Sequence, residues 1–279
     1  MSIALLQDLH LLTRDGHLNA DARRKLKQIR HLVGLLRPAL DDALARSADP
    51  LIVDCGAGKS YLGALLHELV LAPAGKGTLL AIEARPELSA QAEQRAARFG
   101  QARFQVVTGA IADAALPRRP SVVTALHACD TATDDALALA IERGADHVAV
   151  VPCCQAEVAR QLASARPSDP VTAALFEHPL HRRELGSHLT NVVRGLVLEA
   201  HGYQVTVTEL VGWEHSAKNE LILGKRVHRH AAPPRAQLRG LLDRFAIEPA
   251  LVRRLAACGL DPRTAPGEPS GVAGEEQQA

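Results

Sequence analysis

Aromatic residues are scarce in this chain of 279 residues, which holds four Phe, two Tyr and one Trp. Proteins that bind single-stranded nucleic acid without sequence preference stack the bases on aromatic side chains, so this composition argues against such a general binder. A large net charge is also lacking, because 32 Lys and Arg are balanced by 31 Asp and Glu. A strongly cationic nucleic-acid-binding protein is therefore not indicated, and any basic surface must be local.

Long apolar runs are absent too, and none reaches the roughly 20 residues that a membrane-spanning helix needs. The opening stretch MSIALLQDLH is too short and too soon acidic for a secretory signal. The five cysteines are odd in number and irregular in spacing, which is unlike a disulfide framework. We therefore expect a cytoplasmic protein with no membrane partner, and the oligomeric state stays open. The cysteines are Cys55, Cys129, Cys153, Cys154 and Cys258.

Short apolar strands alternate with helices through the middle of the chain, which favours an α/β fold with a mostly parallel sheet and helices on both faces. The pattern predicts an antiparallel pair of strands near the C-terminal end of that sheet. Capping residues and glycine stops predict a helix over 133–144, capped by Thr133, and another over 187–202. The expected strands lie at 50–55, 77–84, 102–109, 120–129, 146–154, 203–211 and 219–227.

Residues 19–47 read as one amphipathic helix, with a leucine-rich stripe on one face and basic residues on the other. Pro38 falls inside this pattern and is expected to kink or end the helix. We expect an N-terminal helical extension over 1–48, a main domain over 49–228, C-terminal helices over 229–262 and a disordered tail over 263–279.

The stretch VDCGAGKSYLG, Val53–Gly63, follows the first strand and carries two overlapping glycine motifs. A P-loop would need glycine at position 53, five residues before Gly58, and valine stands there. A dinucleotide fingerprint would need glycine at position 61, where Tyr61 would obstruct close packing of helix on strand. Each of these two motifs therefore lacks a glycine that it requires.

A third reading fits the loop, because Asp54-x-Gly56-x-Gly58 resembles the first motif of class I S-adenosylmethionine-dependent methyltransferases. Glycines let the backbone approach the methionine part of that cofactor closely. An aspartate can attract its ammonium group, and the amides of the next helix can receive its carboxylate. A glutamate ending the second strand can accept both ribose hydroxyls. The expected cofactor residues are Asp54, Gly56, Ala57, Gly58, Lys59, Glu83, Ala84, Ile111 and His127.

Two further motifs narrow the resemblance. LHACDTATDDALA, Leu126–Ala138, follows the fourth strand, and VVPCCQ, Val150–Gln155, follows the fifth. With DCGAGK they resemble the methyltransferase family marked by D-x-G-A-G-K, H-x-C-x-x-x-T-D and a Cys-Cys pair, which includes tRNA 2′-O-methyltransferases of the acceptor stem. The zinc modules of those tRNA enzymes have no counterpart here, because no cysteine precedes Cys55. The resemblance implies a methyltransferase acting on RNA, tRNA or rRNA, and no DNA partner is expected.

Ligands of an open parallel sheet bind beyond the carboxyl ends of its strands, so the strand-end residues should line one cleft. His127 and Asp130 are the candidates to orient or deprotonate the methyl acceptor, although His127 could equally serve to fix its loop. Thr133 and Asp134 are better explained as a helix cap. The candidate acceptor-binding residues are Cys153, Cys154, Gln155, Arg182, Lys218 and Asn219.

Other readings of the same residues stay open. A metal site is not predicted, because adjacent cysteines fit one tetrahedral centre poorly, yet a cysteine-centred metal protein remains a rival. The acceptor could be a protein or a small molecule rather than RNA. A module that binds S-adenosylmethionine or RNA without catalysis is the remaining alternative.

Overall fold

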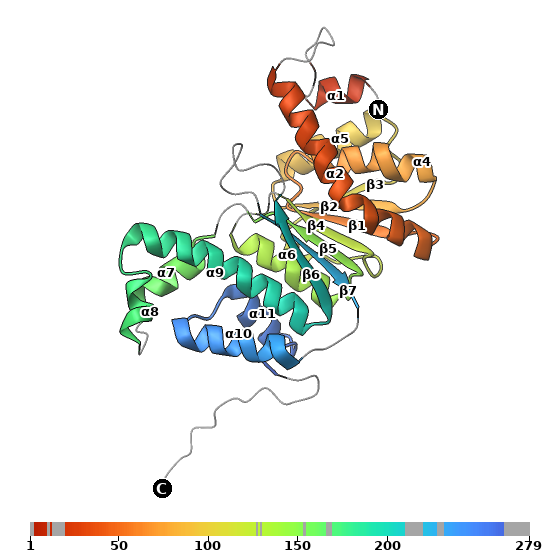
Figure 1. Ribbon diagram of the computed structural model, residues 1–279. Helices are drawn as coiled ribbons and strands as arrows, with labels where there is room; N and C mark the ends of the chain where they lie inside the picture. The colour runs from red at the N-terminus through yellow and green to blue at the C-terminus, as the bar shows by residue number, and fades with distance from the viewer. Residues whose placement is uncertain are drawn as a thin grey trace. The chain divides into compact units, whose positions relative to one another are not determined.

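A computed structural model gives the fold of the chain and describes residues 3–9, 12, 20–126, 128, 130–152, 155–165, 169–209, 220–227 and 232–264. The chain divides into two compact units. Figure 1 shows the helices and strands that make up each of them. The first comprises Met1–Cys154 with Gln204–Val227, and the second comprises Gln155–Tyr203 with His228–Ala279. The division into separately folding parts at residues 48, 228 and 262 remains a prediction. No helix of the described residues is long and apolar enough to cross a membrane.

The first unit is built on a seven-stranded sheet in the order β3-β2-β1-β4-β5-β7-β6. Strands β1 to β5 run parallel to one another, and β7 pairs antiparallel with β5. The predicted Rossmann-like α/β class, with its antiparallel C-terminal strand, is confirmed. The strands are β1 (Leu51–Cys55), β2 (Thr78–Glu83), β3 (Phe104–Thr108), β4 (Val122–Ala125), β5 (His147–Val150), β6 (Tyr203–Glu209) and β7 (Glu220–Arg226).

The helices of the first unit alternate with the strands, as the sequence pattern predicts. They are α1 (Ile3–Asp8), α2 (Ala20–Arg46), α3 (Tyr61–Leu66), the π-helical turn η1 (His67–Leu71), α4 (Ala72–Ala74), α5 (Pro86–Arg98), the short 3₁₀ turn η2 (Ile111–Asp113) and α6 (Thr131–Glu142). The predicted N-terminal helix is confirmed as α2, and it continues through Pro38 to Arg46.

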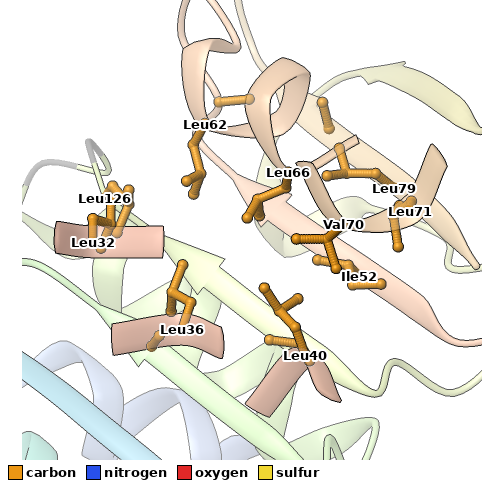
Figure 2. Close-up of a cluster of buried hydrophobic side chains, with 14 of the residues drawn as sticks. Leu32, Leu36, Leu40, Ile52, Leu62, Leu66, Val70, Leu71, Leu79 and Leu126 are labelled. Carbon is orange, nitrogen blue, oxygen red and sulfur yellow. The ribbon is translucent and has the colours of Figure 1, made fainter. Parts of the chain in front are cut away.

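One face of the sheet is covered by α2, α3 and η1, whose leucines interdigitate with alternate residues of β1 and β2 (Figure 2). The intervening strand residues are buried as well, so they point to the opposite face. Helix α6 contacts β4 and β5, and its buried residues lie outside the cluster on the first face. The labelled members of that cluster are Leu32, Leu36, Leu40, Ile52, Leu62, Leu66, Val70, Leu71, Leu79 and Leu126.

Helix α2 is also held to the sheet by a polar contact. Asp42 Oδ2 lies 2.7 Å from His147 Nε2, at the start of β5. That hydrogen bond is the largest influence on Asp42 and holds the pKa of its carboxyl below the ordinary value. The long N-terminal helix is therefore fixed to the sheet by a buried histidine as well as by its leucine stripe.

The second unit is helical apart from its share of β6. Its helices are α7 (Glu157–Ser164), α8 (Pro170–Ala174), α9 (Pro179–Ala200), α10 (Ala232–Phe245) and α11 (Ala250–Ala257). Helix α9 contacts both α7 and α10. It begins at Pro179, eight residues before the predicted start at residue 187, because Pro179 occupies the first helical turn, where a missing N–H costs nothing.

Helices α7 and α9 approach so closely at Gly186 that no side chain fits. A Cβ there would lie 2.7 Å from the backbone nitrogen and Cα of Ala159. We predict that Gly186→Ala destabilises the protein by about 1–3 kcal/mol, because backbone atoms cannot move aside as a flexible side chain would. Chemical denaturation followed by circular dichroism measures this change.

Gly240→Ala is the matched control in α10, where an added Cβ meets nothing within 4 Å. Alanine favours a helix over glycine, so this variant should be neutral or more stable by up to about 1 kcal/mol. Equal destabilisation by both substitutions would contradict the close approach of α7 and α9.

Candidate functional site

The loop between β1 and α3 turns sharply through two glycines with positive φ, Gly56 at +64° and Gly58 at +58°. The Ala57 amide donates to the Ile82 carbonyl of β2 at 3.0 Å, and the Ser60 amide donates to the Ala57 carbonyl at 2.7 Å. Ser60 itself has φ of 53° and begins α3. The glycine loop, residues 56–60, is therefore bound to the end of the neighbouring strand.

Gly56 is required for a second reason besides its dihedral angle. A Cβ at this position would lie 3.2 Å from the Cβ of Ala128, which follows β4. That distance is tighter than most Cβ contacts, and a side chain at positive φ adds strain. The glycine loop and the segment after β4 are thus in contact, as expected of strand ends that share one edge of the sheet.

Asp54, near the end of β1, is only 3% exposed. Its Oδ1 accepts a hydrogen bond of 3.0 Å from Thr124 Oγ1 of β4. Burial raises the pKa of this carboxyl to about 7, a rise that the Thr124 hydrogen bond opposes and the nearby Glu83 increases. A carboxyl in this state gains most from a cationic partner, since a positive charge nearby would restore its ionised form.

Glu83, the last residue of β2, is 4% exposed, and both of its oxygens are engaged. Oε2 accepts from the Gly58 amide at 2.6 Å, and Oε1 accepts from Nε of Arg85 at 2.7 Å. The Arg85 amide also donates to Oε1, at 3.1 Å. Burial alone would raise the pKa of Glu83, but the hydrogen bonds from Arg85 and Gly58 outweigh it, so the pKa lies below its ordinary value.

These features fit the amino-acid and ribose parts of S-adenosylmethionine. Glycines with positive φ leave the loop bare of side chains, and an added Cβ at Gly58 would meet nothing closer than 3.9 Å. Asp54 offers a buried carboxyl for an ammonium, and Glu83 offers a buried carboxylate for hydroxyls. The Ser60 hydroxyl at the start of α3 is a buried donor with no hydrogen-bond partner among the described residues.

Three further predicted cofactor residues, Lys59, Ala84 and Ile111, belong to the described part of the chain. Lys59 and Ala84 are exposed, while Ile111 is buried in η2. The Gly109 amide donates to the Glu83 carbonyl at 3.0 Å, which joins the end of β3 to the end of β2 just before η2. Their roles in binding stay predictions.

Asp130, one of the two predicted catalytic residues, stands at the start of α6 with φ of 51° and ψ of −118°. This conformation is rare for a residue with a side chain, and such strain is often kept at functional sites. Thr133 was predicted as the cap of this helix, and that prediction is wrong. Thr133 lies inside α6 and donates its hydroxyl to the Ala128 carbonyl at 2.5 Å.

The predicted acceptor residues that the structure describes, Gln155 and Arg182, both belong to the second unit. Gln155 is buried, with its Nε2 donating to Asn191 Oδ1 at 3.1 Å and its Oε1 accepting from Ser187 Oγ at 2.8 Å. Arg182 lies in the first turn of α9 and is half-buried. The predicted residues outside the described parts are His127, Cys153, Cys154, Lys218 and Asn219.

Metal ligands are not grouped within the described residues, where no three His, Cys, Asp or Glu side chains are placed to hold an ion. Cys55 is buried and Cys258 is exposed. Burial raises the pKa of the Cys55 thiol, so this cysteine is a poor nucleophile.

Sequence reasoning missed two side chains that act directly on the carboxylates. Thr124 stands in register with Asp54 across the β1–β4 pair, which becomes visible only once the strand order is known. Arg85 follows Glu83 by two residues, and this spacing was the one signal that could have indicated a pair.

The sequence comparison agrees with this geometry. Residues 24–161 match a family model described as a methyltransferase domain. None of the curated proteins compared with the chain matches it.

Among solved structures, the chain is similar to magnesium protoporphyrin IX methyltransferase from Synechocystis PCC 6803 with bound SAH, at 12% identity and a TM-score of 0.47, over 79% of this chain and 94% of that one. It is also similar to an rRNA methylase from Streptococcus thermophilus, at 10% identity and a TM-score of 0.45, over 70% and 95% of the two chains. No statement about substrate follows from similarities this low. Over residues 24–161 the chain therefore matches a methyltransferase domain, in agreement with its sheet and glycine loop.

Proposed function

We propose that the protein is an S-adenosylmethionine-dependent methyltransferase whose acceptor is RNA. One observation carries the cofactor assignment: two buried carboxyl groups, Asp54 and Glu83, lie at the carboxyl ends of adjacent parallel strands, and the glycine loop that follows the first contacts the second. A triphosphate is disfavoured there, because both carboxylates would repel it.

The chain's own residues would bind the cofactor, orient the methyl acceptor and take its proton. When bound, the cofactor would supply a methyl group on its sulfonium; a nucleophile in line would bond to the methyl carbon as the carbon–sulfur bond breaks and S-adenosylhomocysteine leaves. The positive-φ backbone at Gly56 and Gly58 would leave room for the amino-acid part, and Glu83 would accept from ribose hydroxyls in place of its contact with Arg85. Asp130 and His127 are the proposed groups that orient the acceptor and take its proton.

The RNA acceptor rests on the motif resemblance and on local basic residues. Arg23 and Lys27 are exposed on α2, and Arg183 is exposed on α9. Such side chains suit contacts with phosphate oxygens. The motif order supports an RNA acceptor more strongly, because it resembles that of a methyltransferase family that includes tRNA enzymes. The motifs are D-x-G-A-G-K, H-x-C-x-x-x-T-D and the Cys-Cys pair.

Methyl transfer from labelled S-adenosylmethionine to total cellular RNA tests the proposal directly. We expect label that nuclease releases, and no label with the Asp54→Ala variant. Label released only by protease would overturn the RNA acceptor and leave the reaction class standing. Cofactor binding without transfer to RNA, protein or small molecules would instead identify a binding module.

The raised pKa of Asp54 predicts a pH-dependent affinity. Asp54 is half protonated near pH 7, and only its ionised form attracts the ammonium. The affinity for S-adenosylhomocysteine should therefore fall by about 25-fold between pH 7.5 and 5.5, as the ionised fraction of Asp54 falls, and calorimetry measures this change. A constant affinity across this range would contradict the ammonium contact.

Asp54→Asn is the control for this pH dependence. Because the pKa of Asp54 is about 7 in the folded protein and 3.8 as its ordinary value, stability that is present below about pH 4 is lost as the pH rises towards 7, and the full destabilisation persists above pH 7. The Asn variant should bind weakly at every pH, yet it should unfold at a higher temperature than the wild type at pH 8. This result would separate loss of binding from loss of folding.

The contact between Glu83 and Arg85 predicts different effects of two substitutions on the affinity for S-adenosylhomocysteine. Glu83→Gln should weaken S-adenosylhomocysteine about 10- to 100-fold, because it removes a charged acceptor of ribose hydroxyls. Arg85→Gln should keep the affinity or raise it a few-fold, because the arginine no longer competes for Oε1. Calorimetry at pH 7.5 measures both, and a large loss with Arg85→Gln would show that the arginine binds the ligand itself.

A further inference from the structure

Helix α1 lies on the same unit as the glycine loop but precedes residue 24, where the match to the methyltransferase domain begins. Its leucines form a small apolar cluster with the first turns of α3, the helix that the loop leads into. Tyr61 packs at the edge of this cluster. The buried members are Leu5, Leu6, Leu9, Ala64 and Leu65.

The last residue of α1 carries an acidic group that reaches α5. Asp8 Oδ2 accepts from Arg95 Nε at 2.6 Å, and Oδ1 accepts from Arg98 Nη1 at 2.5 Å. The Asp8 and Arg95 side chains are 18% and 11% exposed, whereas Arg98 is 62% exposed. The pair with Arg95 is therefore shielded from solvent, and the pair with Arg98 is at the surface.

Arg95 makes a second contact, and it is with the glycine loop. Its Nη1 donates to the Lys59 carbonyl at 2.7 Å. Lys59 is the residue between Gly58 and Ser60, both of which have positive φ. One guanidinium thus connects α1 to the backbone of the loop at the point where the chain enters α3.

The fork of the guanidinium explains why arginine stands here. Nε and Nη1 lie on different edges of one rigid plane, so the direction of the Asp8 contact fixes the direction of the Lys59 contact. A backbone with positive-φ residues on both sides of Lys59 has few favourable conformations of its own and depends on such anchors. The Gly58 amide is held by Glu83 on one side, and the Lys59 carbonyl is held by Arg95 on the other.

We propose that Arg95 is a positioning residue for the cofactor loop and that Asp8 of α1 keeps it in place. The segment before the methyltransferase domain thereby sets the affinity for the amino-acid part of the cofactor. This inference rests on the proposed function, since it assigns the loop to that ligand. It also predicts that the ribose and adenine contacts do not depend on the Asp8–Arg95 pair.

Two ligands separate positioning from general stability. S-adenosylhomocysteine contains the amino-acid part, and 5′-methylthioadenosine lacks it while keeping the adenosine. We expect Asp8→Asn and Arg95→Gln to weaken S-adenosylhomocysteine about tenfold, the effect of losing a charged hydrogen bond. Binding of 5′-methylthioadenosine should change by less than about twofold, both measured by calorimetry on the full chain.

Arg95→Lys is the most informative variant, because it keeps a cation beside Asp8 but lacks the second guanidinium nitrogen that donates to the Lys59 carbonyl. It should fold like the wild type by circular dichroism and still bind S-adenosylhomocysteine about tenfold more weakly. Arg98→Gln is the matched control, since Arg98 contacts Asp8 and the Phe99 ring. It should leave both affinities unchanged.

The double variant Asp8→Asn/Arg95→Gln should bind no more weakly than Arg95→Gln alone, because Asp8 acts through Arg95. Equal weakening of both ligands, or none, in variants that fold would overturn the inference and leave the proposed function intact. Failure of the wild type to bind either ligand would overturn the proposed function and the inference with it.

Discussion

The hydrogen bond between the Gly58 amide and Glu83 Oε2, at 2.6 Å, is the contact on which the arrangement of the site depends. It joins the loop after the first strand to the carboxylate that ends the second. The same carboxylate holds Arg85, and the same loop holds Arg95 through the Lys59 carbonyl. Glu83, Arg85 and Arg95 are therefore all joined to the glycine loop or to the carboxylate that holds it.

The two acidic residues are equally buried but differ in their chemistry, because different donors surround them. Asp54 has one hydroxyl donor, Thr124, and burial raises its pKa to about 7. Glu83 is equally buried, but an arginine and backbone amides keep its pKa below the ordinary value. The first is suited to respond to a cation that arrives with a ligand, and the second remains an acceptor at any physiological pH. Neighbouring donors, rather than residue type, set this difference.

The strands and the glycine loop could be predicted because their signals are local. Apolar runs between turn residues located β1 to β5, and the failed positions Val53 and Tyr61 excluded two phosphate-binding loops. The contact of Asp8 with Arg95 could not be predicted, since it joins residues 87 positions apart. Thr133 was misread as a cap because a cap depends on backbone angles, and the positive φ at Asp130 moved the helix start three residues earlier than a Thr133 cap would place it. The motifs at His127, the Cys153–Cys154 pair and Lys218 fall outside the described residues.

The close approach of Gly56 to Ala128 has a consequence for how such a protein can change over time. Residue 56 is confined to glycine while Ala128 occupies the adjoining space, so substitutions at these two positions are not independent of each other. Under the proposed function, a new acceptor preference would then have to arise at other positions of the segment after β4. Exchange of that whole segment would have to preserve the small residue that faces Gly56.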